Sequence, residues 1–245
     1  MQKAGIIIIG NEILSGRTLD RNSNFICLRC SSIGIDVKEV KVIGDKQNII
    51  MKNVLEYSRK FDQVFVTGGI GPTHDDITSE AISKAFKRKY QINKKAKKLL
   101  TEHYKKSNLE LNESRTKMAK IPIGARLILN PVSVAPGFKI KNVWVMAGVP
   151  KIMQAMFTSY VEPKLKREKA YECEEIIVNK PEGDVAHLVE KLQNKYEILD
   201  VGSYPFYNPP NLGTNIIIRG RNRKLLKESK RYFCDLLKEN LIPFS

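Results

Sequence analysis

The sequence predicts an α/β protein in which a mostly parallel sheet lies between two layers of helices, followed by a small α+β module. Two apolar runs, residues 6–9 and 64–66, are typical of parallel strands that are covered on both faces. Between these runs, residues 47–59 space their apolar side chains as an amphipathic helix does. Because crossovers between parallel strands are right-handed, this alternation predicts helices on both faces of the sheet.

The other elements of the first two thirds follow from the same periodicities. The first helix is expected to end near Ser32, where Gly34 provides a stop. The second strand spans residues 35–43, and its alternation slips near Glu39, which predicts an edge strand or a bulge. Further segments predict helices at 77–86, 93–106 and from 150 onwards, and strands at 126–129 and 143–146.

A basic stretch at residues 164–169 marks the expected boundary between a first domain, 1–168, and a second domain, 169–245. The second domain has the order strand, helix, strand, strand, helix, which is typical of a small ferredoxin-like module. Its aromatic and proline-rich segment, 204–210, is expected to be a lid, an interface patch or a flexible loop. The expected elements are strands at 174–178, 197–201 and 215–219 and helices at 184–195 and 222–240.

Composition indicates a globular protein with a basic surface. Hydrophobic residues make up 42% and charged residues 28% of the chain, and no window approaches the ~20 apolar residues of a membrane span. The N-terminus lacks a secretory signal, so we expect a cytoplasmic protein. The net charge of +16 comes from scattered lysines, which favours a solvated face over a specific nucleic-acid site. Cys27 and Cys30 lack a second pair, which favours free thiols over a zinc site.

A glycine-rich turn, residues 68–71, joins the 64–66 strand to the helix that follows it. In an open parallel sheet, ligands bind at the carboxyl ends of the strands, against such turns. Glycine lets the backbone approach a phosphate, and free N–H groups at a helix start favour an anion. The turn has neither the lysine of a Walker A loop nor the third glycine of the dinucleotide fingerprint. Glycine spacing alone therefore leaves a phosphate turn and a purely structural turn open.

Carboxylates follow three of the expected strands. Glu12 follows the first strand, Asp45 the second, and Asp75 and Asp76 the third. The carboxyl ends of parallel strands share one edge of a sheet, so we expect these side chains to face one crevice. Grouped carboxylates beside a phosphate turn suit a divalent cation that bridges to phosphate oxygens. Each alone is more often a helix cap, and Thr73 with Asp76 has the spacing of a capping box.

Several longer motifs together carry a family resemblance. They are TGGIGPTHDDIT (67–78), GNEIL (10–14), GD (44–45), NESRTKMAKIP (112–122), ARLILNPVSVAPGF (125–138) and AGVPKIMQAMF (147–157). This set resembles the molybdopterin-binding domain of the MoaB/MogA type, in the version of CinA-like competence/damage-inducible proteins and of the N-terminal half of eukaryotic FAD synthases. GSYP (202–205) and GTNIIIRG (213–220) resemble the segment that follows this domain there. The AGVPK turn departs from the proline-rich turn of the commoner family form.

The resemblance implies a pyrophosphatase that splits the diphosphate of an ADP-containing dinucleotide, ADP-ribose or FAD, and releases AMP. It implies that Asp45, Asp75 and Asp76 are catalytic, and that Glu12, Asp45 and Asp76 hold Mg²⁺, Mn²⁺ or Co²⁺. It also implies a homodimer or homotrimer. The expected ligand contacts are Gly10, Asn11, Thr67, Gly68, Gly69, Ile70, Gly71, Pro72, Thr73, Thr78, Asn112, Arg115, Pro131, Pro136 and Gly137.

Two other functions stay open. The same crevice suits a pterin, so a role in molybdenum-cofactor biosynthesis is the second hypothesis. The module after residue 168 favours the pyrophosphatase, because small MoaB/MogA proteins lack it. A non-catalytic nucleic-acid-binding module is the third hypothesis and rests on charge alone. Arg17 and Asn22 resemble further polar positions of the family's ligand loop, and a solvated position suits each equally well.

Overall fold

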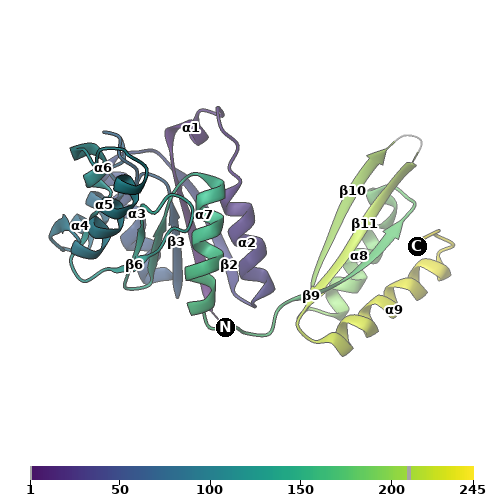
Figure 1. Ribbon diagram of the computed structural model, residues 1–245. Coiled ribbons are helices and arrows are strands. Elements are labelled where there is room, and N and C mark those ends of the chain that lie inside the picture. The colour runs from purple at the N-terminus through teal and green to yellow at the C-terminus, as the bar shows by residue number, and fades with distance from the viewer. Residues whose placement is uncertain (1, 209–210) are drawn as a thin grey trace. The chain divides into compact units, whose positions relative to one another are not determined.

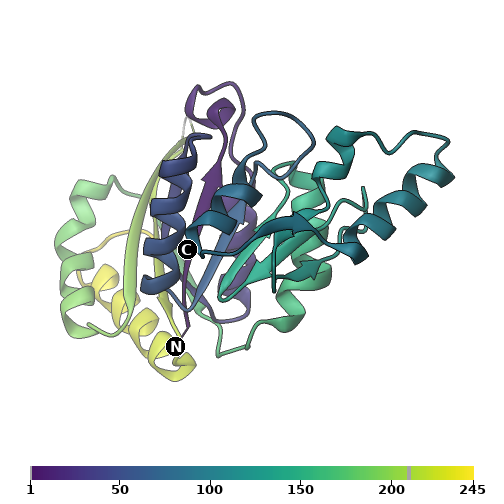
Figure 2. The same cartoon turned by 90° about the vertical axis from the view of Figure 1, so that its left-hand side faces the viewer.

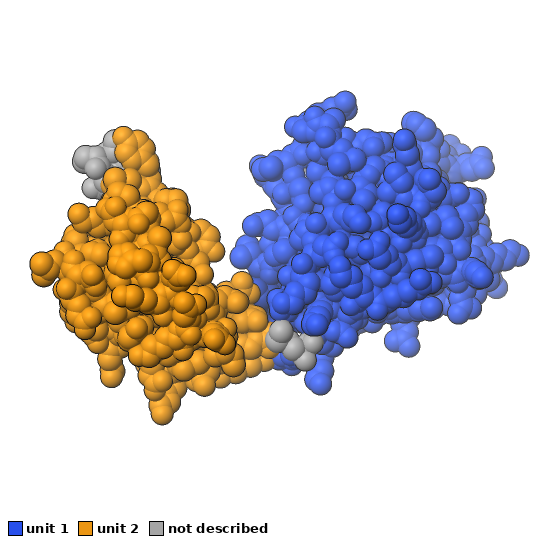
Figure 3. Space-filling view, turned by 180° about the vertical axis from the view of Figure 1, so that it is seen from behind, with its two compact units in different colours: residues 1–168 blue, residues 169–245 orange. Residues whose placement is uncertain are grey.

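The computed structural model describes residues 2–208 and 211–245, and the chain divides into two compact units (Figure 3). Unit 1 spans Met1–Glu168 and unit 2 spans Lys169–Ser245. Each unit has a hydrophobic core of its own. Within the described residues, no helix has the length and apolar character needed to cross a membrane.

Unit 1 is built on a six-stranded sheet with the order β2-β1-β3-β8-β7-β6. The pairs of β1 with β2, β1 with β3 and β3 with β8 are parallel, and β7 pairs antiparallel with both β8 and β6. The expected mostly parallel α/β sheet is therefore confirmed. The strands are β1 (Lys3–Ile9), β2 (Asp36–Ile43), β3 (Gln63–Thr67), β6 (Arg126–Ile128), β7 (Gly137–Ile140) and β8 (Val143–Met146).

Helices cover both faces of this sheet, because alternate residues of each strand point to opposite sides (Figures 1 and 2). On one face, Ile6 and Phe65 pack with residues of α2 and α7 and of the π turn η1. On the other face, Ile7 and Val66 pack with residues of α3 and α4. The covering elements are α2 (Asn22–Ser32), α3 (Gln47–Lys60), α4 (Thr78–Ala85), α7 (Pro150–Met156) and η1 (Phe157–Val161).

Strand β2 is an edge strand with a bulge, as its broken alternation predicts. Ala4 pairs with Val37 and Gly5 pairs with Glu39, so Lys38 is the extra residue. In the adjacent α2, Cys30 is fully buried, and burial together with the nearby charges of Cys27 and Glu162 raises the pKa of its thiol to about 12. Such a thiol stays protonated and unreactive, which agrees with the expectation of free cysteines.

A small subdomain is inserted between α4 and β6. A two-stranded sheet, β4 (Tyr90–Ile92) with β5 (Lys120–Pro122), carries α5 (Lys94–Lys106), α6 (Glu113–Lys117) and the loop between them. Ala96, Leu100 and Ala119 form its core, against which Met118 and Ala135 pack. The subdomain therefore reaches the main body of unit 1 through the loop that contains Ala135.

Unit 2 is an antiparallel sheet of order β10-β11-β9 with α8 and α9 on one face (Figure 1). This confirms the expected α+β module. Residues 204–208, expected to be a loop, belong to strand β10, while 209–210 lie outside the described residues. The elements are β9 (Glu172–Val178), α8 (Glu182–Lys195), β10 (Asp200–Asn208), β11 (Asn211–Gly220) and α9 (Arg223–Glu239).

Strand β10 lies at one edge of the unit 2 sheet, and two of its backbone positions offer no free donor. The N–H of Val201 donates to Gln193 Oε1 at 3.0 Å. Pro205 has no N–H, and proline inside a sheet is confined to edge strands for this reason. Proline is compatible with this strand because, among the described strands, β10 pairs only with β11.

Candidate functional site

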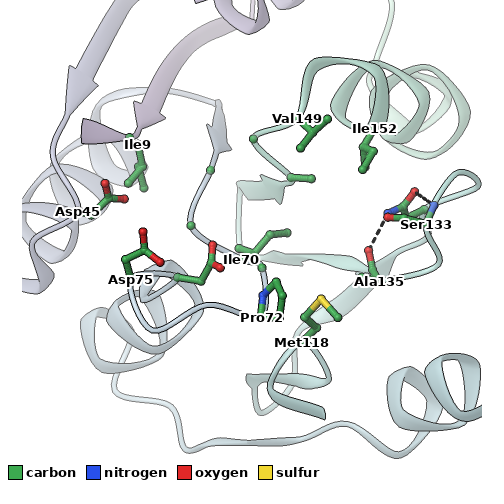
Figure 4. Close-up of a pocket in the computed structure, with 18 of the residues that line it drawn as sticks. Ile9, Asp45, Ile70, Pro72, Asp75, Met118, Ser133, Ala135, Val149 and Ile152 are labelled. Atoms are coloured by element: carbon green, nitrogen blue, oxygen red, sulfur yellow. Dashed lines mark hydrogen bonds between the residues drawn. The ribbon is translucent and has the colours of Figure 1, made fainter. Parts of the chain in front are cut away.

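The carboxyl ends of β1, β2 and β3 open into a cavity of about 410 Å³ in unit 1 (Figure 4). After β1, the N–H of Gly10 donates to Ile43 O at 3.1 Å, which ties the first turn to the end of β2. The N–H of Asn11 then donates to Asp45 Oδ2 at 2.9 Å. The first two turns are thereby held together by hydrogen bonds, and Glu12 and Asp45 line the same cavity.

The glycine turn after β3 forms the floor of this cavity. Gly68 has φ +103° and Gly69 has φ +68°, which side chains with a Cβ rarely adopt. A Cβ on Gly68 would lie 2.1 Å from Ile9 O, so the turn presses directly against the end of β1. Within the described residues, the N–H groups of Gly69, Ile70 and Gly71 donate no hydrogen bond to the protein. Successive free N–H groups of this kind form a concave site for an anion.

Thr73 organises the acidic turn that follows. Its hydroxyl lies 2.5 Å from Asp75 Oδ1 and 2.6 Å from Asp76 Oδ2, and its N–H donates to Asp76 Oδ2 at 2.8 Å. Helix α4 begins only at Thr78, after Ile77, so Thr73 is not the helix N-cap that the capping-box spacing predicts. The hydrogen bond from the Thr73 N–H to Asp76 forms nevertheless. Together with the contacts of the Thr73 hydroxyl, it holds both carboxylates in a turn that precedes α4.

The carboxylates on the cavity wall carry like charges and affect one another's pKa. Burial raises the pKa of Asp45, and the negative charges of Glu12 and Asp75 raise it further, while the N–H of Asn11 opposes the shift. By contrast, the hydrogen bond from Thr73 lowers the pKa of Asp75. The two carboxyl groups therefore differ in basicity: Asp45 holds a proton more readily, and Asp75 stays ionised.

The carboxylates suit a cation that takes only part of its ligands from the protein. Among residues 2–208 and 211–245, no three His, Cys, Asp or Glu side chains already stand together as a metal-binding group. Mg²⁺ usually binds through one or two carboxylates, and water and substrate phosphate complete its coordination. Four carboxylates on one wall, beside a turn with free N–H groups, fit that mode of binding and not a closed protein cage.

The opposite wall of the cavity is mostly apolar and includes Met118, Ala135, Val149 and Ile152 (Figure 4). The buried Asn130 shapes the loop that contributes to this wall. Asn130 Oδ1 accepts from the N–H groups of Val132 and Ser133 at 2.9 and 3.0 Å. Its amide nitrogen donates to Ser133 Oγ at 2.7 Å and to Ala135 O at 3.0 Å. Val134 has φ +65°, an uncommon value for a β-branched residue. The loop is thus held in a strained shape by four hydrogen bonds of one side chain.

The structure brings ten of the expected residues together on the cavity wall. Asn11, Thr73 and Thr78 support it through the backbone or through neighbouring side chains. Thr67 is buried and lies 3.4 Å from the amide nitrogen of Asn22, which also donates to Gly148 O at 2.7 Å. The residues on the wall are Gly10, Glu12, Asp45, Gly68, Gly69, Ile70, Gly71, Pro72, Asp75 and Asp76.

The other expected contacts lie outside the cavity lining. Asn112 Oδ1 caps α6 by accepting from the N–H of Arg115 at 2.9 Å. The Arg115 guanidinium stacks 4.7 Å above the ring of Tyr104 and donates to Glu110 O at 2.5 Å. Local hydrogen bonding therefore occupies both side chains. The expected contacts absent from the lining also include Pro131, Pro136 and Gly137, and Arg17 is exposed.

Sequence reasoning missed most of the apolar wall. Met118 reaches the cavity from the end of α6, and Val149 and Ile152 reach it from the start of α7 (Figure 4). Asn130 lies in a loop that the sequence singled out for its prolines, whereas the asparagine supplies the hydrogen bonds. An asparagine followed by proline, as in Asn130-Pro131, is the sequence signal for such a loop, because an Asn side chain can hydrogen-bond the backbone two residues further on.

Both units of the chain match known protein families. Residues 5–167 match a family model described as a probable molybdopterin binding domain, and residues 170–244 match the middle domain of FAD synthase. A protein of Archaeoglobus fulgidus is 34% identical over 235 residues, covering 96% of this chain and 97% of that protein. A protein of Pyrobaculum calidifontis is 36% identical over 213 residues, covering 84% and 81%.

A solved structure supports the same assignment. The protein CinA of Thermoplasma acidophilum, whose function is unknown, is 35% identical and aligns with a TM-score of 0.60 over 64% of this chain and 95% of that chain. The family resemblance is thereby confirmed. The chain belongs to the family with a MoaB/Mog-like probable molybdopterin binding domain, joined here to a FAD synthase middle domain.

Proposed function

We propose that unit 1 is a metal-dependent pyrophosphatase that hydrolyses the diphosphate of an ADP-containing dinucleotide, ADP-ribose or FAD, to release AMP. One observation carries this proposal: three free N–H groups and four carboxylates line the same cavity. The N–H groups favour a phosphate, whereas the carboxylates alone would repel it. A divalent cation between carboxylates and phosphate reconciles the two, and this pairing is typical of phosphate-ester and anhydride chemistry.

The chain's own residues divide the work. Gly69, Ile70 and Gly71 would hold the diphosphate through their N–H groups. Where Asp45 is not itself a ligand of the cation, its carboxylate would take a proton from the water that attacks phosphorus. The anhydride P–O bond then breaks, the bridging oxygen leaves with one phosphate, and the proton remains on Asp45. The apolar wall opposite would hold the adenine or flavin ring and exclude water from it.

One or two of the side chains of Glu12, Asp45 and Asp76 would hold the cation. When bound, the cation neutralises charge on the phosphate oxygens and lowers the pKa of a coordinated water. Asp76 also accepts the N–H of Thr73, so its orientation is fixed before any ligand arrives. A preorientated carboxylate loses little conformational freedom on binding.

The test is to incubate the protein with ADP-ribose, FAD or NAD, each with Mg²⁺, Mn²⁺ or Co²⁺, and to follow AMP by chromatography. We expect metal-dependent AMP release, and a loss of ~10²-fold or more in Asp76→Ala, which removes both a cation ligand and the turn's hydrogen bond. Asp235→Ala, an exposed carboxylate of α9 paired with Lys238, is the matched control and should keep full activity. AMP release that survives in Asp76→Ala would refute the assignment.

A pterin-binding role in molybdenum-cofactor biosynthesis is the second candidate. It is favoured by the match of unit 1 to the probable molybdopterin binding domain. The apolar wall around the Asn130 loop would receive the pterin ring, and the free N–H groups its phosphate. If no dinucleotide yields AMP, the protein should be titrated with a phosphorylated pterin in a calorimeter. Heat of binding would support the pterin role, and its absence would contradict it.

A further inference from the structure

Lys117 joins the inserted subdomain to the acidic turn. It is the last residue of α6, and its ammonium donates to the backbone oxygen of Thr73 at 2.5 Å. The hydroxyl of the same Thr73 contacts both Asp75 and Asp76. One lysine therefore contacts the residue that orients the two carboxylates.

The residue next to Lys117 forms part of the cavity itself. Met118 follows α6 directly and lies on the cavity wall (Figure 4). It also packs against the small core of the subdomain, beside Ala96, Leu100 and Ala119. A change in the Lys117 contact would therefore move a wall of the cavity together with the subdomain.

Lys117 also brings a positive charge to a region that is otherwise acidic. Its charge, together with that of His74, helps to lower the pKa of Asp75, although the hydrogen bond from Thr73 is the larger cause. Four carboxylates, those of Glu12, Asp45, Asp75 and Asp76, line this side of the cavity. An ammonium group and a divalent cation near the same carboxylates repel each other, so each weakens the binding of the other.

We propose that Lys117 latches α6 to the acidic turn through the Thr73 backbone oxygen, and that a divalent cation at this turn releases the latch. This inference rests on the proposed metal site of unit 1. Because such coupling is reciprocal, a cation that weakens the latch binds more tightly when the latch is absent. Release of α6 frees Met118 from its fixed place on the wall, so metal uptake would precede and ease the entry of the nucleotide.

The test is calorimetric titration with MnCl2 alone, without nucleotide, of the full-length protein and three variants. Lys117→Met should bind Mn²⁺ about fivefold more tightly than the wild type, because its competing charge and contact are gone. Lys117→Arg should return toward the wild-type affinity. Lys105→Met is the matched control: it removes the same charge from an exposed position in the last turn of α5 and should shift the affinity far less.

Hydrogen exchange gives an independent readout of the latch. In the wild type, Mn²⁺ should speed exchange in residues 107–118, whereas in Lys117→Met exchange there should already be fast without metal. Equal Mn²⁺ affinity in wild type and Lys117→Met, or an equal gain in Lys105→Met, overturns the latch and leaves the hydrolase proposal intact. If the wild type takes up no Mn²⁺, Mg²⁺ or Co²⁺ at all, both proposals fail together.

Discussion

Both units are built on a β-sheet covered by helices, but the strand connections differ, and the cavity described above belongs to unit 1. In unit 1, parallel strands bring three segments to one edge of the sheet, where a cavity forms. They are Gly10 with the start of the short helix α1 (Asn11–Leu14), residues 44–45 and residues 68–76. In unit 2, the β10–β11 hairpin joins strands that are already neighbours in sequence, and both helices cover one face. Parallel topology collects distant residues at one end of a sheet, which a hairpin does not do.

The units differ as sharply in charge. Unit 2 holds 12 of the 42 Lys and Arg residues and 11 of the 26 Asp and Glu residues, so its net charge is +1 and that of unit 1 is +15. A compositional bias of the whole chain would affect both units alike. The positive charge is therefore concentrated in unit 1, and a positive net charge favours the approach of anionic ligands.

The largest expected effect comes from truncating a core side chain, which tests whether the two units fold independently. Phe233 is fully buried in unit 2, so Phe233→Ala should lower the free energy of unfolding of that unit by about 4 kcal/mol. Unit 1 should keep its stability. Phe65→Ala, in the unit 1 core, is the reciprocal variant. Hydrogen exchange resolved by peptide measures both, and loss of protection across both units in either variant would show that they fold as one body.

A somewhat smaller effect tests the glycine turn. Gly68→Ala would place a Cβ 2.1 Å from Ile9 O at a φ of +103°, and should destabilise unit 1 by about 3 kcal/mol. Gly183→Ala in α8 is the control, because a Cβ there meets nothing within 4 Å and should be neutral or slightly stabilising. Urea unfolding of both variants gives the two values. A Gly68→Ala protein as stable as the wild type would contradict the close packing of this turn against β1.

The smallest expected effect is the loss of folding stability that the ionised Asp45 causes in the acidic cavity. The raised pKa of Asp45 means that the folded protein binds this proton more tightly than the unfolded chain, so its ionisation destabilises the fold as pH rises above about 4. Asp45→Asn should therefore stabilise unit 1 at pH 7, by less than about 1 kcal/mol because the group is half-exposed. The gain should vanish below pH ~3.9, where Asp45 is protonated in both states. A gain that persists at low pH would point to packing instead.

The sequence predicted those parts of the site that follow strands. Gly68 directly follows β3, Asp45 follows β2 after one residue, and Asp75 lies in the turn between β3 and α4. Parallel pairing of β1 with β2 and β3 brings these turns to the same edge of the sheet. Lys117 and Met118 could not be found in this way, because they reach the cavity only after a separate subdomain packs against the main body. The periodicity of apolar residues in the sequence does not predict how this subdomain packs against the main body.

Two mistaken expectations have a common physical origin. Thr73 with Asp76 has the spacing of a capping box, and residues 204–208 have the composition of a loop. In each case the local signal is real: the hydrogen bond between Thr73 and Asp76 forms, and Pro205 does limit pairing. The tertiary setting decides the outcome, since α4 begins later and the edge of a sheet tolerates proline.

The blocked positions of β10 bear on how this protein behaves at high concentration. An open edge strand recruits strands from other molecules, which leads to fibres and insoluble aggregates. With the Val201 N–H already bound by Gln193 and no N–H at Pro205, a foreign strand finds an interrupted ladder there. The nine-residue strand at the margin of unit 2 is therefore a poor template for pairing with a strand of another molecule.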